Sequence, residues 1–223
     1  MNSQNSQRGF SLVELMIAMT VTLIIAGIAS TLVAQSFRMR SREDARSDAI
    51  ADAQRALNIV SRELANSGFG LIDNGLVPDD TSSGSVRFRS DLNAYVRDGA
   101  GDPVPTAGLV TDADEDVKYS MYHDTAANRH YLVRFDVTLG GREGTTVLAN
   151  KLNDFRLTYY DKDGNLLDVD ANPLNCRDAW KIKIEVGVDL PAEGQEGSPG
   201  YQPPSSIRLI SDVVLRNASQ ITY

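Results

Sequence analysis

The pattern of apolar and polar positions begins with an unusually long apolar run. Residues 10–34 are apolar almost throughout, and Glu14 is the single charged side chain among them. As a helix, this run is about 37 Å long, which is enough to cross a hydrocarbon layer of about 30 Å. A helix in a soluble core is seldom apolar on every side over such a length. The run therefore predicts a segment that inserts into a membrane.

The helix is expected to continue beyond the apolar run. No Gly or Pro occurs from Ser41 to Ala65, and apolar residues recur there every three or four positions, as on one face of an amphipathic helix. This face consists of Ala45, Ala49, Ala53, Ala56, Leu57, Val60 and Leu64. Its shallow alanines suit close packing against a sheet. The segment Asn66-Ser67-Gly68-Phe69-Gly70 predicts the end of the helix, with Gly68 as a left-handed cap.

The rest of the chain predicts short strands joined by loops. Alternating apolar and polar residues, typical of half-buried strands, occur at 85–89, 117–123, 130–137, 146–148, 152–160, 180–190 and 207–215. The second and third of these flank a turn at Asp124–Arg129 and predict a hairpin. Residues 191–206 are rich in Pro, Gly and Ser, which predicts a long exposed loop. We therefore expect an α+β fold, in which the second half of a long N-terminal helix packs on an antiparallel sheet.

Composition narrows the function classes. Hydrophobic residues make up 42% and charged residues 23%, as in a globular protein that buries a core. The net charge of −8 makes the chain a poor general binder of nucleic acid, because phosphate binding needs clustered Lys and Arg. Cys176 is the single cysteine, so no intramolecular disulfide can form, and we expect a partly buried thiol in a loop.

Three kinds of segment fit the apolar run. It is an uncleaved membrane anchor, a secretory signal peptide cut after Ala29, or a helix whose leader is cut before the run. Glu14 discriminates among them, because a carboxylate costs about 2.5–3.5 kcal/mol at the membrane centre and less near its edge. A plain anchor or a signal peptide gains nothing from this carboxylate, whereas a filament subunit does. Cleavage after Gly9 makes Phe10 a cationic N-terminus, and the amine of one subunit then pairs with Glu14 of its neighbour. The alternative is a Glu that snorkels to the membrane edge.

The stretch Arg8-Gly9-Phe10-Ser11-Leu12-Val13-Glu14-Leu15-Met16 resembles the type IV prepilin signature. That signature combines a basic leader, Gly before the cut, a methylated Phe after it and Glu at the fifth mature position. The resemblance implies cleavage by prepilin peptidase between Gly9 and Phe10 and N-methylation of Phe10. It implies a pilin-like fold with a leader, a membrane-spanning and filament-core helix, an amphipathic continuation of this helix, and a β-rich periplasmic domain, at residues 1–9, 10–37, 38–66 and 67–223.

The body extends the resemblance. Four segments look like those of PilW-like minor pilins: Arg62–Gly70, Tyr131–Arg134, residues 147–165 and Val214–Asn217. The J-type minor pseudopilin of type II secretion is similar over the same regions. The resemblance implies a subunit of the bacterial inner membrane that primes or caps a pilus. The implied partners are the major pilin, other minor pilins, the prepilin peptidase and the inner-membrane assembly platform, with the ATPase on another chain.

One observation opposes this orientation. Arg38, Arg40, Arg42 and Arg46 follow the apolar run, whereas Arg8 alone precedes it. The positive-inside rule by itself would place the body in the cytoplasm. The leader motif outweighs this tally, because prepilins have a dedicated export signal. The rival from another class is a binding domain or enzyme tethered by an ordinary single-pass anchor, which predicts that Met1 is retained.

No combination of residues indicates catalysis or a resident cofactor. Asp161, Asp163 and Asn165 alternate like the start of a calcium loop, but the later positions fail, and the Asp163-Gly164 pair favours a tight turn. Calcium there is a weak expectation. A second acidic cluster is expected to be a solvated loop: Asp112, Asp114, Glu115 and Asp116. A metal site at His123 and His130 would need a third ligand, for which Asp124 is the nearby candidate; ordinary surface histidines are favoured.

Overall fold

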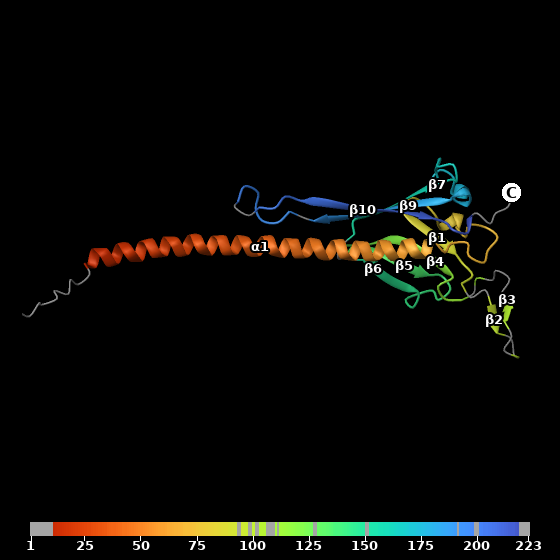
Figure 1. Ribbon diagram of the computed structural model, residues 1–223, viewed down its shortest axis with the longest axis horizontal. Helices are drawn as coiled ribbons and strands as arrows, with labels where there is room; N and C mark the ends of the chain where they lie inside the picture. The colour runs from red at the N-terminus through yellow and green to blue at the C-terminus, as the bar shows by residue number, and fades with distance from the viewer. Residues whose placement is uncertain are drawn as a thin grey trace, which may run out of the picture. The chain divides into compact units, whose positions relative to one another are not determined.

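The structure is a computed structural model with one long helix followed by β-strands (Figure 1). The α+β layout expected from the sequence is confirmed. Two compact units are distinguished: Met1–Ala45 with Ala192–Pro203, and Arg46–Pro191 with Pro204–Tyr223. The residues described are 11–92, 95–97, 100, 103–105, 110, 112–126, 129–149, 152–190, 192–198 and 201–218.

The strands form two four-stranded antiparallel sheets. The first has the order β1 (Ser85–Arg89), β4 (Asp116–Asp124), β5 (Arg129–Asp136) and β6 (Thr145–Ala149). The second has the order β10 (Ser205–Val214), β9 (Lys181–Leu190), β7 (Asp154–Tyr160) and β8 (Leu166–Leu167). A further pair is formed by β2 (Tyr95–Arg97) and β3 (Pro103–Pro105), and two 3-10 helices are η1 (Pro78–Asp80) and η2 (Pro173–Asp178).

Most of the predicted strands are confirmed, but they form two sheets where the sequence analysis expected one. The hairpin pairs β4 with β5, from Val117 opposite Asp136 to Asp124 opposite Arg129. The segments expected at 146–148 and 152–160 are β6 and β7, and these lie in different sheets. The strands β2, β3 and β8 escaped prediction because two or three residues are too few to show an alternation.

One face of α1 (Leu12–Leu64) forms part of the core. Its buried residues are Ala49, Ala53, Ala56, Leu57, Val60 and Leu64. The alanines bring the helix backbone close to its neighbours, as the sequence predicts. Ala45 differs from expectation: it is exposed, since it belongs to the first compact unit and the core begins one turn later.

The same core contains residues from the inner faces of both sheets. The rings of Phe88 on β1 and Tyr119 on β4 stack with their centroids 6.2 Å apart. On β9 the alternation predicted from the sequence is confirmed, because Ile182, Ile184 and Val186 are buried whereas the intervening side chains are half-buried. The helix and the two sheets therefore share one apolar interior.

The helix ends in a loop that is buried at Ser67–Gly68 and at Asn74–Gly75 and exposed between them, as at Ile72. Gly68 has φ +76°, as expected for the cap, and its N–H donates to the carbonyl of Arg89 at 2.9 Å. The Asn74 side-chain amide donates to carbonyl oxygens of the η2 segment at 2.8, 2.9 and 3.2 Å, those of Cys176, Arg177 and Ala179. Gly75, with φ +76°, accepts from the Arg89 N–H at 2.8 Å. The loop thereby joins the helix end to β1 and η2.

The second acidic cluster is not a solvated loop, so that expectation was wrong for two of its members. Glu115 is 1% exposed and Asp116 is 6% exposed, whereas Asp112 and Asp114 are exposed as expected. Arg87 donates to both carboxylate oxygens of Asp116, at 2.7 and 2.8 Å. The Arg89 Nε donates to Asp116 at 2.9 Å. The arginines come from β1, so the sequence around the cluster gave no sign of them.

The ion pairs extend from Asp116 to the η1 helix. Asp80 accepts from Lys118 at 2.5 Å and from Arg87 at 2.7 Å. These two hydrogen bonds hold the pKa of Asp80 below its ordinary value. Burial acts to raise the pKa of Asp116, but the hydrogen bonds from Arg87 and Arg89 outweigh burial and lower it. Both carboxylates therefore stabilise the fold in their ionised form.

We predict that Gly75→Ala destabilises the fold by about 2–4 kcal/mol. A Cβ at this position would lie 2.3 Å from the Arg89 carbonyl oxygen and 2.3 Å from the Gly68 nitrogen, and backbone atoms cannot easily give way. The measurement is urea unfolding of the full-length protein in detergent, followed by the fluorescence of Trp180, the single tryptophan. Gly84→Ala is the control, because a Cβ there meets nothing within 4 Å. Equal unfolding midpoints for the two variants would contradict the packing described.

A second prediction concerns acid. Because the pKa values of Asp80 and Asp116 are lowered by folding, their contribution is present above the unfolded pKa of about 4 and is lost as pH falls through the folded values. Asp116→Asn should cost about 1–3 kcal/mol at pH 7, since it removes the carboxylate that pairs with Arg89 and one of the two that pair with Arg87. Its stability should also fall less between pH 5 and pH 2 than that of the wild type. Asp163→Asn, at an exposed turn, is the control; a wild-type-like acid response from Asp116→Asn would refute the assignment.

Candidate functional site

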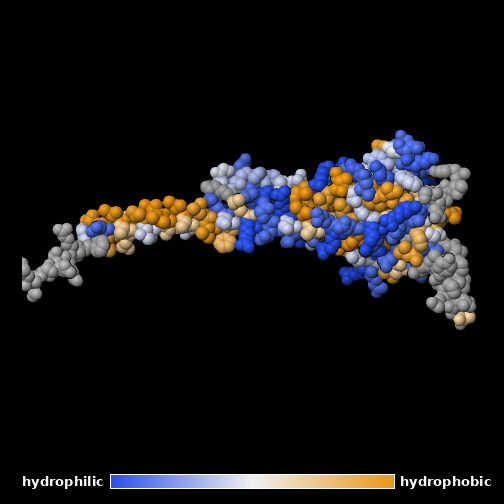
Figure 2. All heavy atoms as spheres, in the orientation of Figure 1, coloured by the Kyte–Doolittle hydropathy of each residue, from blue (hydrophilic) through white to orange (hydrophobic). Residues whose placement is uncertain are grey.

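The N-terminal half of α1 exposes its apolar side chains, many of which are visible on the face that Figure 2 shows. About half or more of the surface of each large apolar side chain in this part of the helix is exposed: Leu12, Val13, Leu15, Met16, Ile17, Met19, Val21, Leu23, Ile24, Ile25, Ile28, Leu32 and Val33. By its length and composition, the helix is long and apolar enough to cross a membrane. Such a surface needs lipid or other helices to cover it.

Four hydroxyl groups within the apolar run donate to carbonyl oxygens of the helix itself. The Thr20 hydroxyl donates to the Ile17 carbonyl at 2.8 Å, and the Thr22 hydroxyl donates to the Ala18 carbonyl at 2.7 Å. Ser30 and Thr31 donate to carbonyls four and three residues earlier, at 2.8 and 2.7 Å. Because an unpaired polar group in hydrocarbon is costly, these internal bonds suit an apolar environment.

Unlike these hydroxyl groups, the Glu14 carboxylate is not hydrogen-bonded to the helix. It lies exposed in the first turn of α1, where the helix dipole favours a negative charge. Within the part of the chain that the structure describes, its carboxylate has no hydrogen-bond or ion-pair partner. Gly9 and Phe10, the predicted cleavage and methylation positions, lie outside the described residues. In the apolar run, four hydroxyl groups thus bond to the helix itself, whereas the Glu14 carboxylate has no partner among the described residues.

A partly buried polar contact joins the other end of α1 to the first sheet. The Tyr119 hydroxyl donates to Glu63 Oε2 at 2.6 Å, and Arg134 Nε donates to the same oxygen at 3.0 Å. Arg134 also donates to Asp114 at 2.6 Å. Burial, with the Glu63 carboxylate beside the ring, raises the pKa of Tyr119. The three elements α1, β4 and β5 are thereby joined at one carboxylate.

The sequence gave no direct sign of this contact. Glu63 and Arg134 are 71 positions apart, so no local periodicity connects them. Each lies, however, in a segment that resembles PilW-like minor pilins, Arg62–Gly70 and Tyr131–Arg134. The structure brings those two segments together. An acidic residue in one segment and a basic residue in the other were therefore the sequence signal from which this contact could have been predicted.

The loop Asp161–Asn165 is a turn between β7 and β8, which confirms that interpretation. One Asp161 carboxylate oxygen accepts from the N–H groups of Asp163 and Asn165 at 2.9 and 2.8 Å, and the other accepts from the Asn165 amide at 2.9 Å. The hydrogen bonds from Asn165 lower the pKa of Asp161. Gly164 has φ +85°. The carboxylate is thus engaged in shaping the turn, and calcium binding at Asp161, Asp163 and Asn165 stays a prediction.

The remaining candidates for chemistry have structural surroundings. His123 and His130 face each other across the β4–β5 hairpin, with ring centroids 4.3 Å apart. Among the residues described, no group of three or more His, Cys, Asp or Glu is arranged to hold a metal ion. Cys176 is fully buried in η2, more than the partly buried loop thiol expected. Burial raises its pKa to about 11, so the thiolate is scarce at neutral pH.

Comparison with known proteins bears on the N-terminal segment. Residues 4–30 match the family described as the prokaryotic N-terminal methylation motif. A search of curated proteins found no match. The motif spans the predicted cleavage site, Glu14 and most of the apolar run, and proteins with this motif are structural subunits rather than enzymes. The match and the apolar helix together indicate a membrane-anchored protein of the type IV pilin-like or pseudopilin-like class.

Proposed function

We propose that this chain is a PilW-like minor pilin, which primes or caps a type IV pilus and performs no catalysis. The observation that supports this most is Glu14, the one carboxylate in an otherwise apolar run within a matched methylation motif. Numbered from Phe10, it is the fifth residue of the processed chain. A plain anchor gains nothing from a charge at this depth, whereas a subunit that pairs it with a neighbour's amine does.

The proposed mechanism begins with storage in the bacterial inner membrane, with the body in the periplasm. Prepilin peptidase cuts between Gly9 and Phe10, and Phe10 is then N-methylated. The apolar half of α1 next leaves lipid for the core of a filament, where neighbouring helices cover the same side chains. Because one apolar environment replaces another, this transfer costs little hydrophobic free energy. Glu14 then sets the register of the subunit, since its carboxylate must reach the amine of Phe10 on its neighbour.

The proposed partners follow from this mechanism. The major pilin and other minor pilins supply the helices that cover α1, and the assembly platform in the inner membrane extracts the subunit. The energy comes from an ATPase on another chain. The second candidate is a J-type minor pseudopilin of type II secretion, which the same body segments favour. Both candidates use the same N-terminal chemistry and differ in the machine that the filament serves.

Processing gives the first prediction from this proposal. Protein purified from native membranes should begin with N-methylated Phe10, because the leader is removed before assembly. Mass spectrometry of the intact protein and of its N-terminal peptide measures this directly. A chain that retains Met1 would support a tethered domain, and a chain that begins at Ser30 would support a secretory signal peptide. Either result would rule out the proposal.

Assembly gives the second prediction. Glu14→Ala should leave the amount of protein in the membrane unchanged and should reduce filament number by about tenfold or more, because the neighbour's amine is buried without a counter-charge. Filaments are counted by electron microscopy in cells whose own copy is deleted, and membrane levels are compared by immunoblot. Glu43→Ala is the matched control, since this exposed glutamate lies on the same helix beyond the apolar run. Normal filament numbers in the Glu14 variant would count decisively against pairing.

A further inference from the structure

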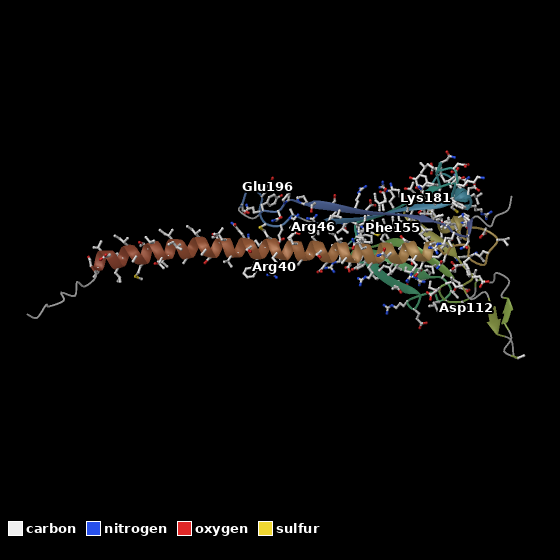
Figure 3. The ribbon with its side chains drawn as sticks, in the orientation of Figure 1. Arg40, Arg46, Asp112, Phe155, Lys181 and Glu196 are labelled. Carbon is white, nitrogen blue, oxygen red and sulfur yellow. The ribbon has the colours of Figure 1, made fainter. Side chains whose placement is uncertain are left out.

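Positive charge is concentrated where the apolar run ends. Between Glu14 and Glu43 the chain has no acidic residue, yet three arginines occur within five positions. We call Arg38, Arg40 and Arg42 the arginine band. Arg38 and Arg40 are exposed on α1, and Figure 3 labels Arg40 on the helix. Because side chains two positions apart on a helix do not share a face, Arg40 points away from Arg38, and the band surrounds α1 with positive charge at one level of the helix. The chain as a whole is acidic, with a net charge of −8.

The position of the band along α1 matches the headgroup layer of a bilayer. Counted from Ala34, the last residue of the apolar run, a helical rise of 1.5 Å places Arg38 about 6 Å and Arg42 about 12 Å further on. The polar layer on each side of the hydrocarbon is about 5–8 Å thick. Arginine side chains are long enough to reach back into it from the outer positions.

The side chains between the arginines fit the same layer. Phe37 is 68% exposed and Met39 is 55% exposed, so apolar groups alternate with the guanidinium groups. A surface that mixes apolar and cationic side chains is typical of segments that lie at the membrane interface. This is a second observation, independent of charge, that points to lipid.

The arginines of the band differ in the contacts that their side chains make. The Arg42 guanidinium donates a hydrogen bond to the carbonyl of Pro203 and so holds the segment Ala192–Pro203 of its own compact unit. Arg38 and Arg40 form no salt bridge with any residue that the structure describes. The next acidic side chains, Glu43 and Asp44, lie further from the apolar run. Arg38 and Arg40 are thus the members of the band that are available to an anionic ligand.

We propose that the arginine band binds the headgroups of anionic phospholipids at the membrane face from which the body emerges. The guanidinium fork matches phosphate oxygens in bidentate geometry, and clustered arginines beside a membrane helix attract anionic lipid. This role accounts for a basic cluster on the side of the apolar run where the positive-inside rule does not expect one. The inference rests on the membrane anchoring in the proposed function and adds to it a lipid that holds the unassembled subunit.

The test uses full-length processed protein reconstituted in phosphatidylcholine vesicles. These contain a trace of spin-labelled phosphatidylglycerol or, in parallel, of spin-labelled phosphatidylcholine, and electron paramagnetic resonance measures the lipid immobilised by the protein. The wild type should prefer phosphatidylglycerol by about fivefold or more, and salt should weaken this preference. Arg38→Gln with Arg40→Gln should bring the ratio close to one. Arg38→Lys with Arg40→Lys should keep a preference, because the charge remains.

The matched control removes two arginines elsewhere. Arg55→Gln with Arg142→Gln changes the net charge equally at exposed positions and should leave the preference intact. An equal loss in both double variants would overturn the proposal, since net charge rather than the band would then select the lipid. Absence of preference in the wild type, or salt-sensitive self-association in its place, would also overturn it. Glu14→Ala should keep the lipid preference, so failure of this inference is separable from failure of the pilin proposal.

Discussion

The constraint on which the rest of the structure depends is that one uninterrupted helix meets two different surroundings. The first half of α1 is apolar on all sides and exposed, whereas the second half is apolar on one face and buries that face against two sheets. A helix satisfies its own backbone hydrogen bonds, so it can pass from one environment to the other without a break. The β-rich body covers the Ala49–Leu64 face, whereas the apolar first half needs lipid or other helices to cover it.

The connection between helix and body is polar as well as apolar. Glu63 holds side chains from β4 and β5 on a single carboxylate oxygen, and the Ser67–Gly75 loop ties the helix end to β1 and η2. Removing one partner from a buried polar contact costs more than the contact itself contributes. These bonds therefore specify where the helix ends and how it docks, and the alanine face provides the close approach.

The features that sequence predicted are those encoded by local periodicity. The alanine face, the β4–β5 hairpin, the alternation on β9 and the Gly68 cap all repeat or stop at fixed short intervals, so a single stretch of sequence reveals them. The burial of Glu115 and Asp116 did not show, because Arg87 and Arg89 reach Asp116 from a strand more than 25 positions away. The division into two sheets has the same cause, since strand order depends on distant pairings. Glu14 was recognisable because its chemistry contradicts its surroundings; the roles of Gly9, Phe10 and the Asp161 loop stay predictions.

The burial of Cys176 has a practical consequence. Cys176 is the single thiol of the chain; it is fully buried, and burial raises its pKa. Maleimides and other cysteine reagents act on the thiolate, so they should pass over the folded native chain. A cysteine introduced on the exposed surface of α1 would then be the reactive one, without any need to replace Cys176 first. Neighbouring subunits could be mapped by cross-linking in an otherwise unaltered protein.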